Sequence, residues 1–368
     1  MSRAISTADA FPFTYADAAA RWTALIEQVP FVMFREPFSC QGQGPSGEAL
    51  ETQVAYIGSE HAPSVMVLIA GTHGIEGFAG SAVMLDFLQS LVDGHCAPDA
   101  GTAVLCIHAL NPWGYAWFRR CDAEGVDLNR NFVDFSKTLP ANPGYPELAP
   151  LFRNPDPQAR HQAFADYIAT HGRQAWEMAV SGGQYVDPSG PFFGGTGASH
   201  GRTVIEAVIE RFGLAQKKLA VIDLHTGLGP YGYGEIICDH EPDSEGTRAA
   251  TAWYGDAVAL PSLGTSSSVP KQGLLDYAWH QIMGKGSCFV TLEFGTLGTQ
   301  SLFDVLFNDH AWWAQQTGLP GSDNISWCAV REAMLHHFYP NDRAWREMVL
   351  FRARQVILQT LDGLQAGI

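Results

Sequence analysis

A histidine and a glutamate three positions apart, His73 and Glu76, stand in the run GTHGIEG at residues 71–77. The apolar run Val65–Ala70 directly before them predicts a strand buried on both faces of a parallel sheet. Open α/β sheets gather their ligands at the carboxyl ends of such strands. A catalytic zinc ion takes three protein ligands from histidine, glutamate or aspartate, plus a water. The spacing predicts that His73 and Glu76 are two zinc ligands; a surface pair at a helix start is the alternative.

The third ligand should come from another strand end. His225 closes the run VIDLH and is followed by Thr-Gly, where an apolar strand opens into a loop. We therefore expect His225 to complete the metal site, with a core histidine as the alternative. His108 is the competitor, and we expect it in the core because it lies inside its own apolar strand.

A single carboxylate, Glu293, interrupts the apolar run FVTLEFGT. An unpaired buried carboxylate is costly, so Glu293 must be paired, face a metal or lie at the strand mouth. A hydrolytic zinc site needs a general base that takes a proton from the attacking water and returns it to the leaving nitrogen. We expect Glu293 to be that base; a structural ion pair is the alternative.

The run RRCDAEGVDLNRN at residues 119–131 is rich in arginine, although the chain has few cationic residues overall. Guanidinium groups suit two tasks in such a site, bidentate binding of a substrate carboxylate and stabilisation of a developing oxyanion. A solvated loop is the alternative. The candidate group for these tasks comprises Arg119, Arg120 and Arg130 together with the polar Asn129.

Alternating strands and helices must position these residues. Apolar residues at helical spacing follow Glu76 and stop near Gly94, which predicts a helix directly after the ligand pair. Strands separated by helices predict an α/β fold: a single large domain over residues 1–368 with a mixed, mostly parallel central sheet flanked by helices. Further strands are expected at Thr52–Ile57, Ala103–Ala109, Leu219–Leu224, Cys288–Phe294 and, at the sheet edge, Glu235–Cys238, and further helices at Tyr15–Val29, Arg202–Phe212, Ser244–Leu260 and after Pro340-Asn341-Asp342.

Residues 132–201 differ in composition and are rich in proline and glycine. One helix is expected there, with Asp156 as its N-cap and Pro157 in the first helical position. The composition suggests an insertion over one face of the sheet. Long loops of this kind are often lids or specificity elements.

Composition narrows the class of protein. The chain has 368 residues, 46% of them hydrophobic, and a formal net charge of −16, which argues against a nucleic-acid partner. We expect no membrane-spanning stretch, and Met1–Arg21 carries acidic residues where a signal peptide has an apolar core. The seven cysteines include no CxxC pair, which favours a reduced, cytoplasmic setting. The oligomeric state stays open.

In this order, HGIE, NPWG, RRCDAEGVDLNRNF, DLHTG and TLEFG resemble the zinc carboxypeptidase superfamily, which also contains aspartoacylase and succinylglutamate desuccinylase. The chain looks closest to the uncharacterised bacterial members. The resemblance covers about residues 65–131 and 219–295, and DLNRNF is its most specific part. It implies one Zn²⁺ per chain, bound by His73, Glu76 and His225, with Glu293 as general base.

The same resemblance assigns roles to individual residues of the polar loop at residues 119–131. Arg120 matches the arginine that polarises the scissile carbonyl, with Arg119 as the fallback. Asn129 and Arg130 match the pair that holds the terminal carboxylate of the substrate. Asp127 matches the carboxylate that orients the first ligand histidine.

Two departures from the pattern leave the substrate open. Gly273-Leu-Leu-Asp276 resembles the Gly-x-x-Asp of the family, but Ser268 stands where digestive carboxypeptidases have a mobile tyrosine, eight residues earlier. Tyr231, Tyr233 and Tyr277 are the candidates to replace it. The spacer from Arg130 to His225 is also much longer than in those enzymes.

We therefore expect a zinc-dependent hydrolase that cleaves an amide bond next to a free carboxylate, in a peptide or a small molecule, as carboxypeptidases do. Hydrolysis of N-acyl amino acids is the alternative, because it uses the same zinc, base and arginines. A non-catalytic zinc-binding protein and a serine hydrolase are further alternatives. The last rests on the GxSxG run around Ser199, which lacks the apolar strand that a nucleophile elbow needs.

Overall fold

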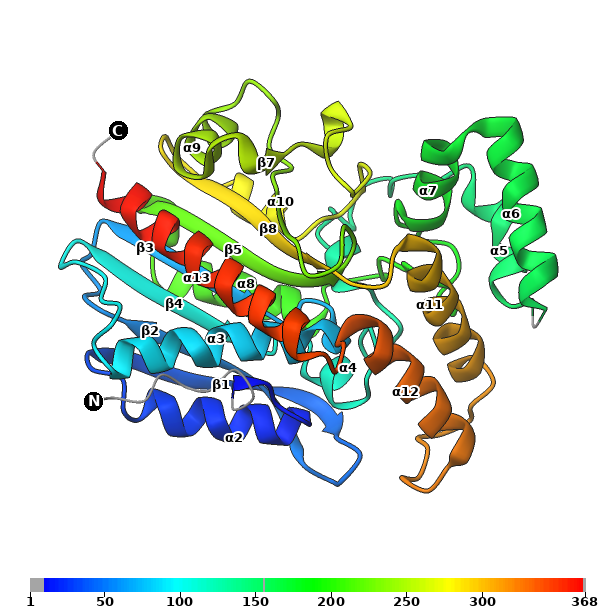
Figure 1. Cartoon of the computed structure of the whole chain (residues 1–368), viewed down its shortest axis with the longest axis horizontal. Coiled ribbons are helices and arrows are strands. Elements are labelled where there is room, and N and C mark those ends of the chain that lie inside the picture. The colour runs from blue at the N-terminus through cyan, green and yellow to red at the C-terminus, as the bar shows by residue number, and fades with distance from the viewer. Residues whose placement is uncertain (1–9, 155, 367–368) are drawn as a thin grey trace.

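The computed structural model describes residues 10–154 and 156–366. Its centre is an eight-stranded sheet with the order β1-β2-β4-β3-β5-β8-β6-β7 (Figure 1). The four middle strands, β4, β3, β5 and β8, are mutually parallel, whereas β2 and β6 run antiparallel to their inner neighbours. This mixed, mostly parallel sheet confirms the predicted fold class. The strands are β1 Val32–Gln43, β2 Ala49–Ile57, β3 Ser64–Ala70, β4 Thr102–His108, β5 Lys218–Gly227, β6 Gly234–Ile237, β7 Val258–Ala259 and β8 Cys288–Gly295.

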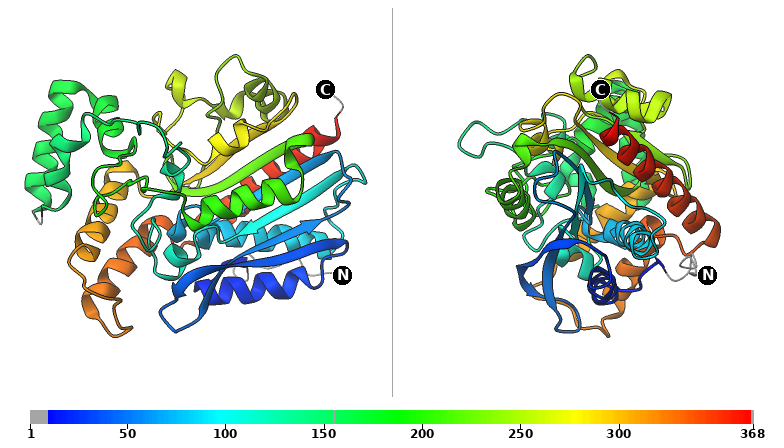
Figure 2. Two further views of the ribbon diagram at one scale, coloured as in Figure 1. Left: turned by 180° about the vertical axis from the view of Figure 1, so that it is seen from behind. Right: turned by 90° about the vertical axis from the view of Figure 1, so that its left-hand side faces the viewer.

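Helices cover both faces of the sheet, as Figure 1 and the reverse view in Figure 2 show. Alternate residues of β3 enter the two cores: Met66 and Leu68 pack on one side, and Val65 and Val67 on the other. This two-sided burial explains why the strand sequence shows no polar alternation. One face carries α2 Tyr15–Ile26, α3 Gly77–Val92, α9 Glu245–Tyr254 and α13 Arg343–Gln365, and the other carries α8 His200–Arg211 and α10 Asp276–His280.

At the two sheet edges, one strand was not predicted and one predicted edge strand lies inside the sheet. The polar, glycine-containing segment after α2 forms β1, which pairs antiparallel with β2 along its length. No residue of β1 is buried, so neither of its faces left an apolar pattern to find. At the other edge, β6 is flanked by both β8 and β7. The predicted helix over Ser244–Leu260 ends at Tyr254, where Gly255 has a φ of +66°.

The 132–201 segment contains three helices before α8 rather than one: α5 Tyr145–Phe152, α6 Pro157–His171 and α7 Arg173–Ser181. Asp156 caps α6 as predicted, accepting hydrogen bonds from the next backbone N–H groups. The three helices form a lobe beside α11 (Thr299–Trp313), not over a face of the sheet (Figure 1). Phe152 stacks on Phe307 of α11 with ring centroids 4.7 Å apart. The segment is thus anchored by aromatic packing.

One stretch within the described residues, Gly74–Val92, is long and apolar enough to cross a membrane, so the expectation that none reaches this length is wrong. In the structure 83% of its most apolar window is buried. Trp22 of α2 donates an indole N–H to the Met84 sulfur, and α13 packs on α3 as well. Its apolar character is that of a core helix.

Candidate metal centre and substrate pocket

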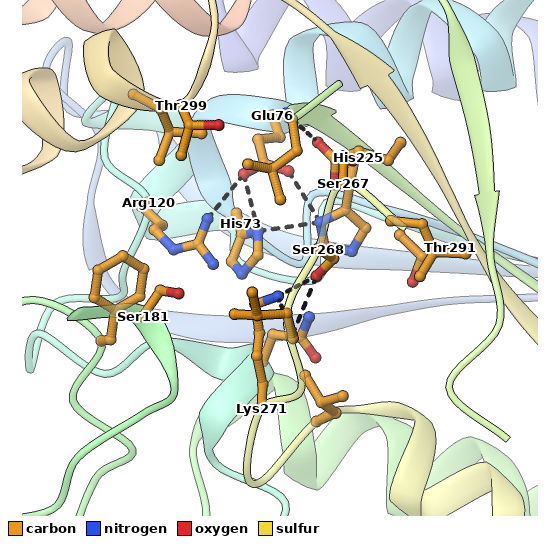
Figure 3. A pocket seen from close by; sticks show the side chains of 18 of the residues that line it. His73, Glu76, Arg120, Ser181, His225, Ser267, Ser268, Lys271, Thr291 and Thr299 are labelled. Carbon is orange, nitrogen blue, oxygen red and sulfur yellow. Dashed lines mark hydrogen bonds and ion pairs between the residues drawn. The ribbon is translucent and has the colours of Figure 1, made fainter. Parts of the chain in front are cut away.

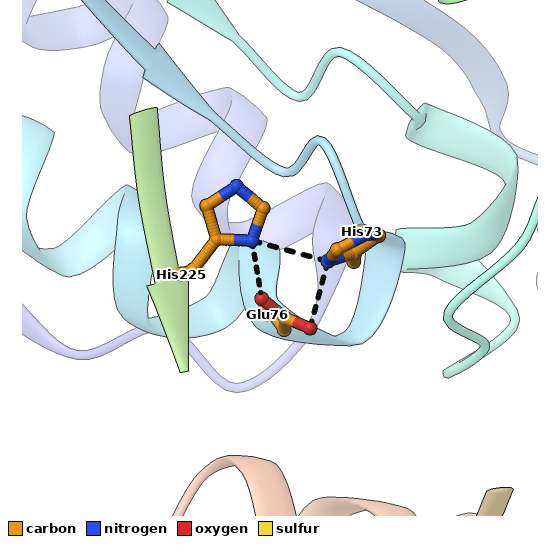
Figure 4. Close-up of side chains that lie close together, drawn as sticks. All are labelled: His73, Glu76 and His225. Carbon is orange, nitrogen blue, oxygen red and sulfur yellow. Dashed lines mark hydrogen bonds and ion pairs between the residues drawn. The ribbon is translucent and has the colours of Figure 1, made fainter. Parts of the chain in front are cut away.

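His73, Glu76 and His225 meet in one buried cluster (Figure 4). The Nδ1 atom of His73 lies 2.9 Å from Glu76 Oε1, and the Nδ1 atom of His225 lies 2.9 Å from Glu76 Oε2. The two Nδ1 atoms are 3.1 Å apart. One possible ligand atom from each side chain therefore lies within 4.8 Å of the others. The structure brings together the three side chains that were predicted to share a metal ion.

A tight turn after β3 creates this convergence. Residues Gly74–Glu76 form a single 3₁₀ turn between β3 and α3, which places Glu76 back over His73. A Cβ atom on Gly74 would lie 2.1 Å from the carbonyl carbon of Gly114, so only glycine fits. The Gly74 N–H donates to the Arg120 carbonyl oxygen at 3.1 Å. The turn is therefore fixed against the loop that carries the arginines.

Each histidine is backed by an aspartate on its other nitrogen. His73 Nε2 lies 3.1 Å from Asp127 Oδ1, and His225 Nε2 lies 2.6 Å from Asp223 Oδ2. A carboxylate accepts the Nε2–H and so leaves the Nδ1 lone pair for the cluster. Asp127, which was predicted to orient the first ligand histidine, contacts His73 in the structure. Asp223 was missed, although its i, i+2 spacing from His225 on a strand places both on one face.

The cluster has the chemistry of a cation site. Burial alone would raise the pKa of Glu76, but His73 and His225 outweigh it and hold that pKa well below its usual range. Burial alone would lower the pKa of His225, but Asp223 and Glu76 outweigh it and raise that pKa well above its usual value. Two lone-pair nitrogens and a carboxylate in contact need a shared proton or a cation. The donor set of two nitrogens and one carboxylate suits zinc.

Glu293 lies on β8, in register with His225 on the neighbouring strand, and lines the same pocket. It accepts a hydrogen bond from the Leu228 backbone N–H at 2.9 Å. Glu293 forms no ion pair within residues 10–154 and 156–366. The alternative of a structural ion pair is therefore wrong for the described residues. Burial, aided by the negative charge of Glu76, raises the pKa of Glu293 to about 7. A carboxyl group with this pKa can both accept and release a proton near neutral pH.

The two adjacent arginines point to different places. Arg120 lines the pocket; its Nε donates to Asp127 at 2.9 Å and its Nη1 to Glu76 at 3.1 Å. Arg119 donates to Asp309 at 2.9 Å and lies over the Trp313 ring. Of the two, only Arg120 lines the pocket.

Asn129 and Arg130 also line the pocket. The Asn129 Oδ1 atom accepts from the Leu275 backbone N–H at 2.8 Å, which leaves its amide NH₂ free to donate. Arg130 is fully buried and donates from Nε and Nη2 to the Ser181 carbonyl oxygen. A third bond from Nη1 reaches the Asn129 carbonyl oxygen, so two of its five N–H groups remain for a ligand. Burial lowers the pKa of Arg130 to about 10, which keeps it charged.

Several elements contribute residues that line the pocket in front of the cluster (Figure 3). The 132–201 segment supplies Ser181 and Phe192, which sequence reasoning did not single out. The loop before α10 supplies Ser267, Ser268 and Lys271.

None of the three candidate tyrosines lines this pocket. Tyr277 donates to the Lys271 carbonyl oxygen, Tyr231 donates to Asp342, and Tyr233 is 45% exposed. The serine of the GxSxG run, Ser199, is the N-cap of α8 and accepts from the Arg202 N–H. No strand leads into it, which removes the basis of the serine-hydrolase alternative.

The family described as "Protein of unknown function (DUF2817)" matches residues 12–352. The chain belongs to this family. No curated protein matches it.

Solved structures show what the fold resembles. Carboxypeptidase A from Helicoverpa armigera is 14% identical, with 96% of this chain and 73% of that one covered and a TM-score of 0.51. Bovine thrombin-activatable fibrinolysis inhibitor is 13% identical over 93% and 99% of the chains, with a TM-score of 0.47. Succinylglutamate desuccinylase from Chromobacterium violaceum is 14% identical over 88% and 74%, with a TM-score of 0.38. The similarity to the Helicoverpa armigera structure shows that the fold is carboxypeptidase-like, as the sequence predicted.

Proposed function

We propose that this protein is a zinc-dependent hydrolase that cleaves an amide bond next to a free carboxylate, as carboxypeptidases do. One observation carries the proposal: His73, Glu76 and His225 converge within 4.8 Å, and Glu293 lines the same pocket. A binding site alone has no need of an unpaired buried carboxyl group with a pKa of about 7.

The protein groups have distinct tasks in this proposal. When bound, a zinc ion lowers the pKa of water and polarises a carbonyl group. Glu293 accepts a proton from the attacking water and donates it to the leaving nitrogen. Arg120, held in place by Asp127, presents positive charge where the carbonyl oxygen becomes negative. The free N–H groups of Asn129 and Arg130 bind the substrate carboxylate and so orient the scissile bond.

Metal analysis of the purified protein tests the metal site first. We expect one zinc per chain in the wild type and in His61→Ala, a control at an exposed histidine, and a large loss in His225→Ala. Full zinc content in His225→Ala would contradict the assignment of this ligand.

A chelator-controlled screen tests the reaction. Peptides and N-acyl amino acids with a free carboxylate should be hydrolysed, the chelator should abolish the activity, and added zinc should restore it. Cleavage of acylated single amino acids with none of peptides would favour the amidohydrolase alternative. A zinc-loaded protein inert on both panels would favour a non-catalytic role.

A further inference from the structure

Lys271 is a cation of the pocket that the proposed reaction does not use. It is half-buried, and in Figure 3 its side chain points toward the centre of the pocket, below His73. Its ammonium group donates to the Ser268 hydroxyl and, at 2.9 Å, to the Val269 carbonyl oxygen. An ammonium group has three N–H donors, so one remains for a ligand.

No carboxylate of the described chain forms an ion pair with Lys271, although Asp239 and Glu293 line the same pocket. Burial, followed by the repulsion of Arg130, lowers the pKa of Lys271 to about 8, and the negative charges of Asp239 and Glu293 oppose this fall without cancelling it. The group is therefore mostly protonated at neutral pH. A partly desolvated cation that forms no ion pair is unfavourable, and a carboxylate ligand in contact with the ammonium group would relieve this cost.

The segment that carries Lys271 is held at both ends. Before it, the Ser267 N–H donates to Glu235 at 3.0 Å. After it, the Gln272 N–H donates to the Gly182 carbonyl oxygen at 3.0 Å. Gly273 has a φ of +69°, and a Cβ there would lie 2.3 Å from the Arg130 carbonyl oxygen. These contacts fix the position of the Lys271 ammonium group relative to Arg130. A charged group held in a fixed position can recognise a substrate group selectively.

We propose that Lys271 is a specificity-determining residue that binds a second carboxylate of the substrate, distinct from the one assigned to Arg130. The released part of the substrate would then be a dicarboxylic amino acid of the aspartate or glutamate class. This inference rests on the proposed function, since it concerns the substrate of the same site.

Two substrates with the same acyl part, one ending in glutamate and the other in glutamine, differ in the charge of the last side chain but hardly in its shape. Comparing their hydrolysis therefore measures the effect of that charge. We expect the zinc-loaded wild type to prefer the glutamate substrate by about 10- to 100-fold in kcat/KM, as charge-assisted hydrogen bonds give. Lys271→Met should remove this preference and leave the glutamine substrate within about threefold of wild type. Lys271→Arg should keep part of it, and Lys285→Met, at an exposed lysine, should keep all of it.

Direct binding makes a second measurement that does not depend on turnover. Titration calorimetry with free glutamate and glutamine should show the same preference in the zinc-loaded wild type and its loss in Lys271→Met. Equal binding and equal cleavage of the two compounds by wild type would overturn the inference and leave the proposed function standing. Equal losses with both compounds in Lys271→Met would also overturn it. A wild type that prefers glutamate in binding but cleaves nothing would refute the hydrolase proposal alone.

Discussion

Replacing Glu293 by glutamine should make the metal-free protein more stable and the zinc-loaded protein nearly inactive. The side chain is 7% exposed and accepts one hydrogen bond, from the Leu228 N–H. The glutamine carbonyl oxygen can accept the same bond at similar volume. The substitution therefore removes a buried negative charge with little change in packing.

The pKa of Glu293 gives the size and sign of the stability effect. Its pKa rises from the usual 4.5 to about 7 in the folded metal-free protein, mainly because of burial. At about 1.36 kcal/mol per pKa unit, ionising it in the folded state costs roughly 3 kcal/mol. Because the folded pKa is raised, this cost is absent below pH 4.5, grows between pH 4.5 and 7, and is complete above pH 7.

Urea unfolding of chelated wild type and Glu293→Gln at several pH values measures the effect. The difference in unfolding free energy should be near zero at pH 4.5 and should approach roughly 3 kcal/mol in favour of the variant at pH 8. The zinc-loaded variant should keep its metal and lose about 10²- to 10⁴-fold in kcat, since general acid–base catalysis typically contributes that much.

Two results would refute this reasoning. A variant no more stable than wild type at pH 8 would mean that the Glu293 carboxylate is well solvated or paired in the folded chain. Near-normal turnover by the zinc-loaded variant would show that another group is the base. Either measurement can fail without the other, so the stability argument and the catalytic argument are tested separately.

Three more substitutions test other parts of the site. Arg120→Ala should lower kcat by about 10²-fold or more, as loss of an oxyanion-stabilising donor does. Arg119→Ala should chiefly lower the melting temperature. Equal losses of kcat in the two variants would contradict the different roles given to the two arginines. Arg130→Ala should raise KM for carboxylate-bearing substrates by roughly 10-fold or more, and an unchanged KM would refute its binding role. Gly74→Ala should lower the unfolding free energy by about 3 kcal/mol in urea titrations, because its Cβ would lie 2.1 Å from a backbone carbon; a loss below about 1 kcal/mol would show that the turn can shift.

Local sequence determined the parts of the site that depend on near neighbours in the chain. The apolar run of β3, the glycine-containing turn and the helical spacing after Glu76 predicted the strand, turn and helix that hold His73 and Glu76. The Asp156 cap was predictable for the same reason, since its hydrogen bonds reach only two and three residues ahead. The apolar runs that contain His225 and Glu293 indicated both residues as well, and the resemblance then assigned them to the same centre.

Only the tertiary structure decided the rest. It placed β5 beside β8 so that His225 and Glu293 fall in register, turned Arg120 into the pocket and Arg119 away, and brought Lys271 to the pocket wall. Strand β1 likewise exists through its pairing with β2. These outcomes depend on hydrogen bonds and packing between segments far apart in the chain. Arg119 and Arg120 have the same side chain, so the local sequence does not distinguish them. They differ in their distant partners, since Asp309 accepts a hydrogen bond from Arg119.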